Sequence, residues 1–447
     1  MYSGRLRDLF RRRPAPRHDT DPGESDTALV GFVAVAAIVG AATGVVAATF
    51  RLLLDQAEHL RAELSGWTHG SWWGVVVTIA VCSACAAAAC ALVYRVEPHA
   101  EGSGIPRVEA VVAGRAEPGR LRLLPIKYLG GLLSIGSGMA LGREGPSVQM
   151  GGSIAGAVAA LTRRCDADLR ILTAGGAAAG LATAFNAPLA GGIFVLEELV
   201  RRFDPRTTVA TLVACAAGFA AARPLVGDRP EFTVPALPSP AIHDAGWVLC
   251  VGVVTGIAGV LYSKTLLRTL RAADRSSAPP EVRAAAIGAV IGILVWCAPD
   301  LAGGGDQLTQ NALGGHGAVA TTLGVFALRF GLGAVSYAAG TPGGLFAPML
   351  VLGANLGLVV GLLGHQVWPG GDVSPSAMAL IGMAAFFTAV VHAPVTGIVL
   401  ATEMTGATNQ LPPMLGACAI AYLIAITLRS RPVYDLLAER SAGLAHP

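Results

Sequence analysis

The sequence predicts an all-α protein that crosses a membrane many times. Of its 447 residues, 53% are hydrophobic and only 14% are charged, whereas soluble domains carry about 25% charged residues. Uncharged apolar runs at 28–50 and 72–94 reach the length of about 20 residues that a helix needs to cross a bilayer. Other apolar runs, such as 284–299 and 382–391, are short or broken by glycine and proline, so we expect helices that cross only partly.

The charge distribution predicts an orientation. Six arginines precede the first apolar run: Arg5, Arg7, Arg11, Arg12, Arg13 and Arg17. By the positive-inside rule the N-terminus is then cytoplasmic. No cleavable signal is expected, because the first apolar run starts late and is too long. No basic folded module follows the arginines, which argues against a nucleic-acid partner.

Two stretches of the chain resemble each other. The segment 187–191 (APLAG) recurs as 393–397 (APVTG), and each is followed by an apolar run and a glutamate, Glu197 and Glu403. Upstream glycines and prolines also match at a nearly constant offset: Gly142, Pro146 and Gly151 with Gly344, Pro348 and Gly353. Membrane transporters often pair repeats, commonly inverted ones, and bind substrate between them where helices break. Two like-folded halves without a site are the structural alternative.

Three loops share one pattern, a glycine-rich turn followed by a helix-starting proline and an apolar helix. They are 102–106, 142–146 and 343–348. Each helix start attracts an anion by about 0.3–1 kcal/mol, so several converging starts are needed to replace its hydration. Ser103 can add a hydroxyl donor, or can simply cap the helix that follows. Phosphate usually recruits Arg or Lys, so these backbone and hydroxyl donors favour a compact monovalent anion.

Glu144 is the most informative residue of the chain. A charge at membrane depth costs at least about 2.5 kcal/mol, and such residues usually face a polar path. Glu144 lies at a predicted helix start, in a position that would also suit a free anion. Because a carboxylate there can occupy an anion site and can also bind a proton, we interpret Glu144 as a candidate gate.

Taken together, these segments resemble the CLC family of chloride channels and proton/chloride antiporters. The resemblance covers residues 28–437 and rests on the three loops, on Phe185–Glu198 and on Arg431–Tyr434. It implies two inverted halves of tilted, partly non-spanning helices, and a homodimer in which each subunit has its own pore. It implies no cofactor.

The resemblance also implies roles for individual residues. Chloride would be held by the hydroxyls of Ser103 and Tyr434 and by the backbone N–H groups of Leu345 and Phe346. An outer anion site would use N–H groups around Arg143 and Gly145. Glu144 would be the gating and external proton glutamate. Without the resemblance, Tyr434 would be interpreted as an interface anchor.

Glu198 bears on the choice between an antiporter and a channel. From the sequence alone it is equally a solvated helix end, since Arg201, Arg202 and Asp204 follow. In the resembling family an acid at this place is the internal proton-transfer site of many antiporters. We therefore expect a secondary-active H+/Cl− antiporter; a passive voltage- or pH-dependent chloride channel is the alternative. Retention of Ser103 favours chloride over nitrate and fluoride.

Other classes of function are not supported by the sequence. An intramembrane enzyme would need an HExxH motif or a nucleophile with its base, and neither is present. His316 and His392 have no ligand companions, so no metal site is expected. The eight cysteines predict no disulfide framework.

The expected organisation has three parts: a basic cytoplasmic segment at 1–27, a transport domain at 28–437 with halves at 28–225 and 243–437, and a short cytoplasmic tail at 438–447. Because the chain ends soon after Tyr434, no nucleotide-binding regulatory domain is expected. The protein should lie in the inner (plasma) membrane with both termini cytoplasmic.

Four further charged residues have weaker interpretations. Glu109 and Lys127 are expected to form an ion pair, buried or at the surface. Arg107 should point into the cytoplasmic solvent, since a cation at a helix start is unfavourable. Glu403 is interpreted as structural.

Overall fold

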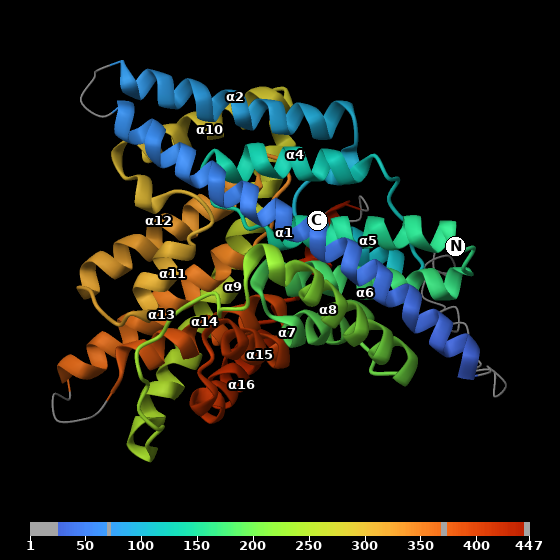
Figure 1. Ribbon diagram of the computed structural model, residues 1–447. Coiled ribbons are helices and arrows are strands. Elements are labelled where there is room, and N and C mark those ends of the chain that lie inside the picture. The colour runs from blue at the N-terminus through green and yellow to red at the C-terminus, as the bar shows by residue number, and fades with distance from the viewer. Residues whose placement is uncertain (1–25, 69–72, 368–372, 442–447) are drawn as a thin grey trace, which may run out of the picture.

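The computed structural model describes residues 26–68, 73–367 and 373–441, and within these ranges it is all-helical (Figure 1). The described residues form seventeen α-helices and no strand beyond two isolated β-bridges. The predicted all-α class is therefore confirmed. The arginines at 5–17 lie outside the described residues, so the N-terminal orientation signal has no structural counterpart here.

The first half of the fold contains eight α-helices, of which α3 and α7 are too short to cross a bilayer. In chain order they are α1 (Asp26–Thr68), α2 (Gly74–Arg95), α3 (Ile105–Val112), α4 (Leu123–Gly136), α5 (Glu144–Leu161), α6 (Asp166–Phe185), α7 (Pro188–Phe194) and α8 (Pro205–Val226). A π-helical turn, η2 (Val195–Val200), continues α7.

The second half repeats this order. Its helices are α9 (Ala245–Arg275), α10 (Pro280–Cys297), α11 (Asp306–Leu313), α12 (Val319–Tyr337), α13 (Phe346–Val367), α14 (Pro375–Val391), α15 (Pro394–Thr405) and α16 (Leu411–Thr427). Helix α17 (Val433–Ser441) follows without a partner in the first half. The proposed boundary between transport domain and tail at 437 falls inside α17.

The packing repeats as well as the order. Helix α5 packs on α6 as α13 packs on α14, and α1 packs on α8 as α9 packs on α16. Across the two halves, α7 packs on α15. There Glu197 accepts from the backbone N–H groups of Val395 and Thr396 (3.1 and 2.7 Å), and Glu403 accepts from those of Leu189 and Ala190 (3.0 and 2.6 Å). Each half thus contributes a glutamate that binds the start of a helix in the other half. Because the two contacts are reciprocal, a local two-fold axis relates the halves.

Eight of the described helices are long and apolar enough to cross a membrane, including α1 and α2, as expected from their sequences. One expectation was wrong: the run 284–299 belongs to α10, whose 18 residues suffice, because Pro280 and the residues after it extend the helix backwards. The run 382–391 ends α14, which at 17 residues is among the shorter apolar helices, as expected.

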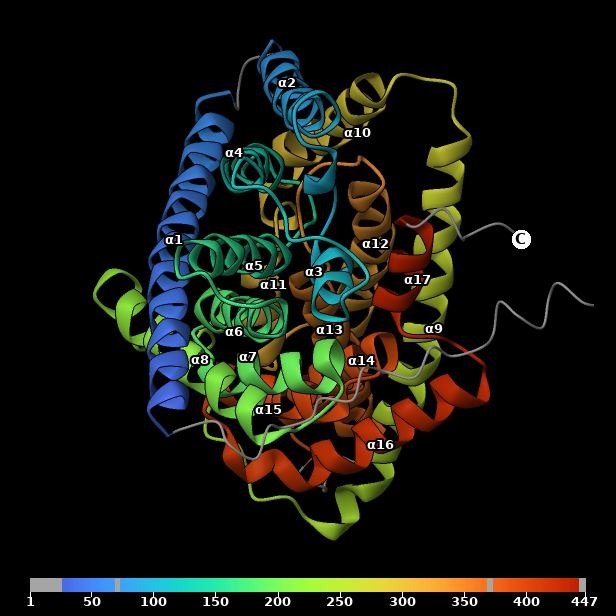
Figure 2. The ribbon, with the colours of Figure 1, turned by 90° about the vertical axis from the view of Figure 1, so that its right-hand side faces the viewer.

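In the view of Figure 2, α13 lies near the middle of the molecule, close to α12 and α14. In its most apolar stretch 89% of the residues are buried, against 28–44% in the other seven candidate spans. The outer helices present large apolar side chains outwards, for example Val76, Leu261 and Leu423. Such apolar surfaces are suited to contact with lipid. The polar groups around α13 lie in the interior of the protein.

Candidate functional site

The starts of α5 and α13 meet at the centre of the fold. Gly142 and Gly344 exchange two backbone hydrogen bonds, with N···O distances of 2.9 and 2.7 Å. These two hydrogen bonds bring Glu144 and Phe346, the first residues of α5 and α13, into the same region of the protein. Because the first N–H groups of a helix lack intrahelical partners, both helices direct unpaired donors towards this region.

The Glu144 carboxylate lies between these two helix starts. The side chain is 1% exposed, and it folds back over Gly142, where a Cβ atom would come within 2.0 Å of Oε2. A side chain at 142 would therefore displace the carboxylate from this position. The backbone N–H of Ala347, in α13, donates to the carboxylate, while Oε2 has no hydrogen-bond partner among the described residues. The carboxylate thus occupies a place that the helix starts make favourable for an anion.

Ser103 packs against the beginning of α5. A Cβ atom on Gly145 would come within 2.4 Å of Ser103 Oγ, so the close approach requires glycine. The expectation that Ser103 caps its helix was wrong: Gly104 is the N-cap of α3, and no side chain caps it. Ser103 Oγ is buried and has no hydrogen-bond partner in the described part of the chain. Its hydroxyl is consequently available to a ligand.

Tyr434 brings a second unpaired hydroxyl into the same interior. The residue is fully buried, and its ring stacks on Phe346 with centroids 6.1 Å apart and meets Phe194 at 6.4 Å. Its Oη atom finds no hydrogen-bond partner among the residues described. Tyr434 is close enough to Glu144 and Glu198 for both carboxyl groups to act on it electrostatically. A buried hydroxyl without a partner costs free energy, so this one, like Ser103 Oγ, indicates a ligand position.

Tyr337 is a site residue that the sequence did not reveal. Its hydroxyl accepts a hydrogen bond from the backbone N–H of Ser103 (3.2 Å), and its ring is 7% exposed. It comes from the end of α12, more than 200 residues away in the chain. No motif surrounds it, so only its contact with the Ser103 loop identifies it.

Glu198 is buried, which excludes the interpretation as a solvated helix end. It is 4% exposed and lies in the π-helical turn η2. Its Oε1 accepts no hydrogen bond among the described residues and lies 3.5 Å from the Arg201 guanidinium. Arg201 in turn donates to Asp435 at 2.6 Å, the residue after Tyr434. Glu198 is therefore linked to the helix that carries the tyrosine.

Among the described residues, three cavities reach this interior. One of about 40 Å³ reaches Glu144 and Ala347, and one of about 940 Å³ reaches Gly102 and Gly104 beside Ser103. A third, of about 330 Å³, reaches Glu198. Ser103, Glu144 and Tyr434 are each at most 1% exposed, so the interior between the cavities is closed to solvent.

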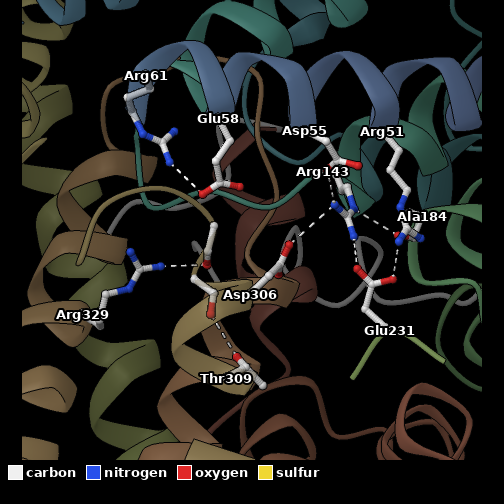
Figure 3. A network of polar contacts seen from close by, with 12 residues as sticks. Arg51, Asp55, Glu58, Arg61, Arg143, Ala184, Glu231, Asp306, Thr309 and Arg329 are labelled. Carbon is white, nitrogen blue, oxygen red and sulfur yellow. Dashed lines mark hydrogen bonds and ion pairs between the residues drawn. The ribbon is translucent and has the colours of Figure 1, made fainter. Parts of the chain in front are cut away.

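The Arg143 side chain lies in a network of charged residues that includes Asp55, Glu231 and Asp306 (Figure 3). Its guanidinium donates to the Ala184 carbonyl (3.1 Å), pairs closely with Glu231, and lies 3.6 Å from Asp55 and 3.5 Å from Asp306. The side chain of Arg143 thus ties the start of α5 to the Ala184 carbonyl and to Glu231.

The expected pair of Glu109 and Lys127 does not form. Lys127 is fully buried and donates to the carbonyls of Ala100 (3.0 Å) and Gly102 (2.6 Å), because these oxygens lie inside while Glu109 faces Arg115 at 3.0 Å. Lys127 therefore supports the Ser103 loop through its backbone. Arg107 lines the large cavity, and its guanidinium donates to the Glu117 carbonyl (3.2 Å).

No group of three or more His, Cys, Asp or Glu side chains in the described ranges could hold a metal ion. The chemistry of the site consists of backbone N–H groups, hydroxyls and carboxyl groups. These groups can bind an anion and exchange protons.

Comparison with known proteins gives the family. The family model described as "Voltage gated chloride channel" matches residues 85–426. The chain belongs to this family, the CLC proteins.

Individual relatives are similar over nearly the whole chain. The H(+)/Cl(−) exchange transporter ClcA of Vibrio parahaemolyticus is 35% identical over 91% of this chain and 89% of its own length. The protein of the same name from Vibrio cholerae is 37% identical over 78% of this chain and 76% of its own. The crystal structure of a slow cyanobacterial Cl−/H+ antiporter superposes with a TM-score of 0.88 at 31% identity, covering 93% of this chain and 98% of that one. A CLC-type fluoride/proton antiporter shares the fold, with a TM-score of 0.75 at 21% identity over 93% of this chain and 99% of that one.

Proposed function

We propose that the protein is a secondary-active antiporter that moves chloride and protons in opposite directions. The observation that carries the proposal is the Glu144 carboxylate, which lies between the starts of α5 and α13 in the place of an anion. A second buried glutamate, Glu198, supports coupling to protons. The names of the relatives, which are exchange transporters and antiporters rather than enzymes, agree with this function.

Chloride binds where the unpaired donors meet. The Ser103 and Tyr434 hydroxyls, both buried without partners, donate to the central ion together with the N–H groups of Leu345 and Phe346. The outer ion takes N–H groups of Arg143 and Gly145, at the start of α5. Since no lysine or arginine side chain contacts the ion, binding stays weak enough for release.

Exchange follows from competition for one place. Ionised Glu144 occupies the anion position and blocks chloride. Protonation removes its charge, so the helix starts then attract chloride more strongly than the neutral carboxyl group. The protonated side chain moves aside, and chloride enters. When Glu144 releases its proton it returns and displaces the ion, which links the two fluxes.

Protons from the other side reach Glu144 through Glu198. The cavity of about 330 Å³ connects Glu198 to solvent, and Tyr434 lies within electrostatic range of both carboxyl groups. The stretch between them is apolar, lined by rings such as Phe194 and Phe346. The proton therefore crosses it over water.

The basic residues support a cytoplasmic position for Glu198. Arg164 donates to the Gly31 carbonyl (3.2 Å), and its guanidinium and that of Arg206 lie over the Phe32 ring. The N-terminal end of α1 therefore shares one side with the start of α8, which closely follows Glu198. By the positive-inside rule this side is cytoplasmic. Helix α5 has 18 residues and spans about 27 Å. Its other end lies on the cytoplasmic side, so Glu144, at its start, lies about that far from this side.

We further propose that two copies form a homodimer in the inner (plasma) membrane, with the transport domain at 28–437 and both termini in the cytoplasm. Each copy contributes every residue of its own site, so each has a separate path. The mass of the purified particle, measured by light scattering with the detergent subtracted, checks the dimer.

The experiment that tests antiport uses sealed liposomes containing only the purified protein. A chloride gradient is imposed, the voltage is clamped with potassium and valinomycin, and the external pH is recorded. Proton movement against its own electrochemical gradient is expected. Chloride flux without proton movement would instead identify a passive channel.

A further inference from the structure

The cavity beside Glu198 contains a histidine that the proposed mechanism has not used. The cavity of about 330 Å³ is lined by Glu197, Glu198 and Arg201 from the end of η2, by Tyr422 from α16, and by His392. The sequence around His392 indicates no function, because no metal-ligating residues accompany it. A titratable ring and a buried carboxyl group therefore share one cavity that is large enough for several water molecules.

The ring of His392 is held in place, but one of its nitrogens is unused. His392 ends α14 with φ 67°, in the left-handed region, where its backbone N–H still bonds to the Thr388 carbonyl. The ring meets Tyr422 edge-on, with centroids 5.4 Å apart. Nε2 is buried and has no hydrogen-bond partner in the described part of the chain. Because an unpaired buried polar atom is unfavourable, this nitrogen indicates an exchangeable partner such as water or a proton.

The two halves of the protein differ at this position. The equivalent residue of the first half, 206 positions earlier, is Asn186, which also ends its helix in the left-handed region, with φ 53°. Its amide donates to the Arg229 carbonyl at 2.8 Å and so ties down a loop. The backbone thus needs only a residue that tolerates positive φ, which asparagine does well. The backbone conformation at the end of α14 therefore does not require a histidine at position 392.

We propose that His392 is a proton-transfer residue that passes protons between the cytoplasm and Glu198. This inference rests on the proposed antiport. Imidazole exchanges protons near neutral pH. A proton from cytoplasmic water binds Nε2, and water in the cavity then carries it to Glu198, whose Oε1 also lacks a hydrogen bond. Imidazole returns to its neutral form and is ready for the next proton.

The charges around His392 suit a temporary cation. Burial of the ring disfavours its protonated form, and the negative charge of Asp435, on α17, opposes this effect in part. Glu197 is engaged with the start of α15, so Glu198 remains the acceptor in the cavity. Arg201, paired with Asp435 at 2.6 Å, opposes a lasting positive charge on the ring. The balance favours passage of a proton over its storage.

The test compares His392→Asn with the wild type in the liposome assay. Asparagine keeps the backbone conformation, as Asn186 does in the first half, but cannot carry the proton. His365→Asn, which removes an exposed histidine at the end of α13, is the matched control. The assay is run at alkaline pH on the cytoplasmic face, where proton supply limits exchange. A positioned proton-transfer group contributes about 100-fold, but cavity water offers a parallel route, so we expect H392N to reduce proton flux about five- to ten-fold.

A second pair of variants separates this role from a structural one. In Glu144→Ala, chloride moves without protons, so chloride flux in E144A and in E144A/H392N should be equal. Equal proton flux in H392N and the wild type would overturn the inference while antiport stands. Lost chloride flux in the double variant would also overturn it, since the substitution would then disturb the chloride path itself. Absence of proton movement in the wild type would overturn antiport and this inference together.

Discussion

Lys127 and Arg329 have the same task in the two halves of the protein. Lys127 donates to the carbonyls of Ala100 and Gly102, before α3, and Arg329 donates to the carbonyls of Leu301 (3.1 Å), Gly303 (2.8 Å) and Gly304 (2.7 Å), before α11. Both cations are at most 1% exposed, and Arg329 is seen beside the Asp306 network in Figure 3. Each cation therefore donates to the carbonyl oxygens of a loop that precedes a short helix.

Lys127→Met should therefore destabilise the Ser103 loop. The buried Ala100 carbonyl would lose its donor, and an unsatisfied group costs about 1–3 kcal/mol. The Gly102 carbonyl would keep only the backbone N–H of Gly343. The midpoint of thermal unfolding in detergent is expected to fall markedly, and chloride binding should weaken. Lys264→Met, on α9, is the control, because none of the described hydrogen bonds or ion pairs involves Lys264. A variant as stable as that control would contradict the supporting role of Lys127.

Tyr337→Phe should weaken chloride binding without unfolding the protein. The substitution removes the acceptor of the Ser103 N–H, and a neutral hydrogen bond contributes about 0.5–1.5 kcal/mol, or about two- to ten-fold in affinity. Isothermal titration with chloride measures the change. Tyr262→Phe removes another buried hydroxyl, one that forms no hydrogen bond in the described part of the chain, and should bind chloride like the wild type. Equal affinity in the two variants would show that Tyr337 does not position Ser103.

Glu144→Ala should separate chloride from protons. Without the carboxylate nothing competes with chloride between the helix starts, so chloride flux persists and proton movement disappears. Glu198→Gln should reduce proton movement while Glu144 still gates chloride. Both are measured in liposomes as chloride efflux and as external pH. Proton pumping by the Glu144 variant would disprove the assignment of the gate.

Glu403→Gln should loosen the contact between the two halves. The carboxylate accepts from two N–H groups at the start of α7, and loss of a cap costs about 1 kcal/mol. Glu197→Gln should have a similar effect on α15, since the contact is reciprocal. The unfolding midpoints of both variants, compared with that of the wild type, check this. A change in only one of them would contradict the equivalence of the halves.

Stability at acid pH should depend on Glu97, which lies between α2 and α3. Burial acts to raise the pKa of its carboxyl group, but hydrogen bonds from Arg122 (2.6 Å) and His99 (2.8 Å) outweigh burial and lower the pKa. Because folding lowers the pKa of Glu97, its ionised carboxylate stabilises the folded protein. This contribution is fully present above the unfolded-state pKa of about 4.3, and it is lost as pH falls through the folded-state pKa. Glu97→Gln should lose this part of the pH dependence. Unfolding midpoints measured from about pH 6 down to about pH 3 test it, and parallel curves for the two proteins would contradict it.

Composition and local patterns determined the class of the protein and the position of its candidate gate. Long apolar runs cannot satisfy their backbone in lipid except as helices, so the all-α fold was evident from the sequence. Glycine, proline and Glu144 at a helix start define an anion position through local geometry, which depends on neighbouring residues alone. The repeat was also evident from the sequence, because the offset between Glu197 and Glu403 matches that of the segments before them.

The contacts between distant segments were decided only by the tertiary structure. Tyr337 holds Ser103, Lys127 binds carbonyls instead of Glu109, and His392 shares a cavity with Glu198, although nothing in the local sequence of these residues differs from ordinary helix ends and core positions. Such pairings depend on how α3, α12, α14 and η2 pack around α13. A buried polar atom takes whichever partner the packing places within reach, and the sequence of one segment does not contain the position of another.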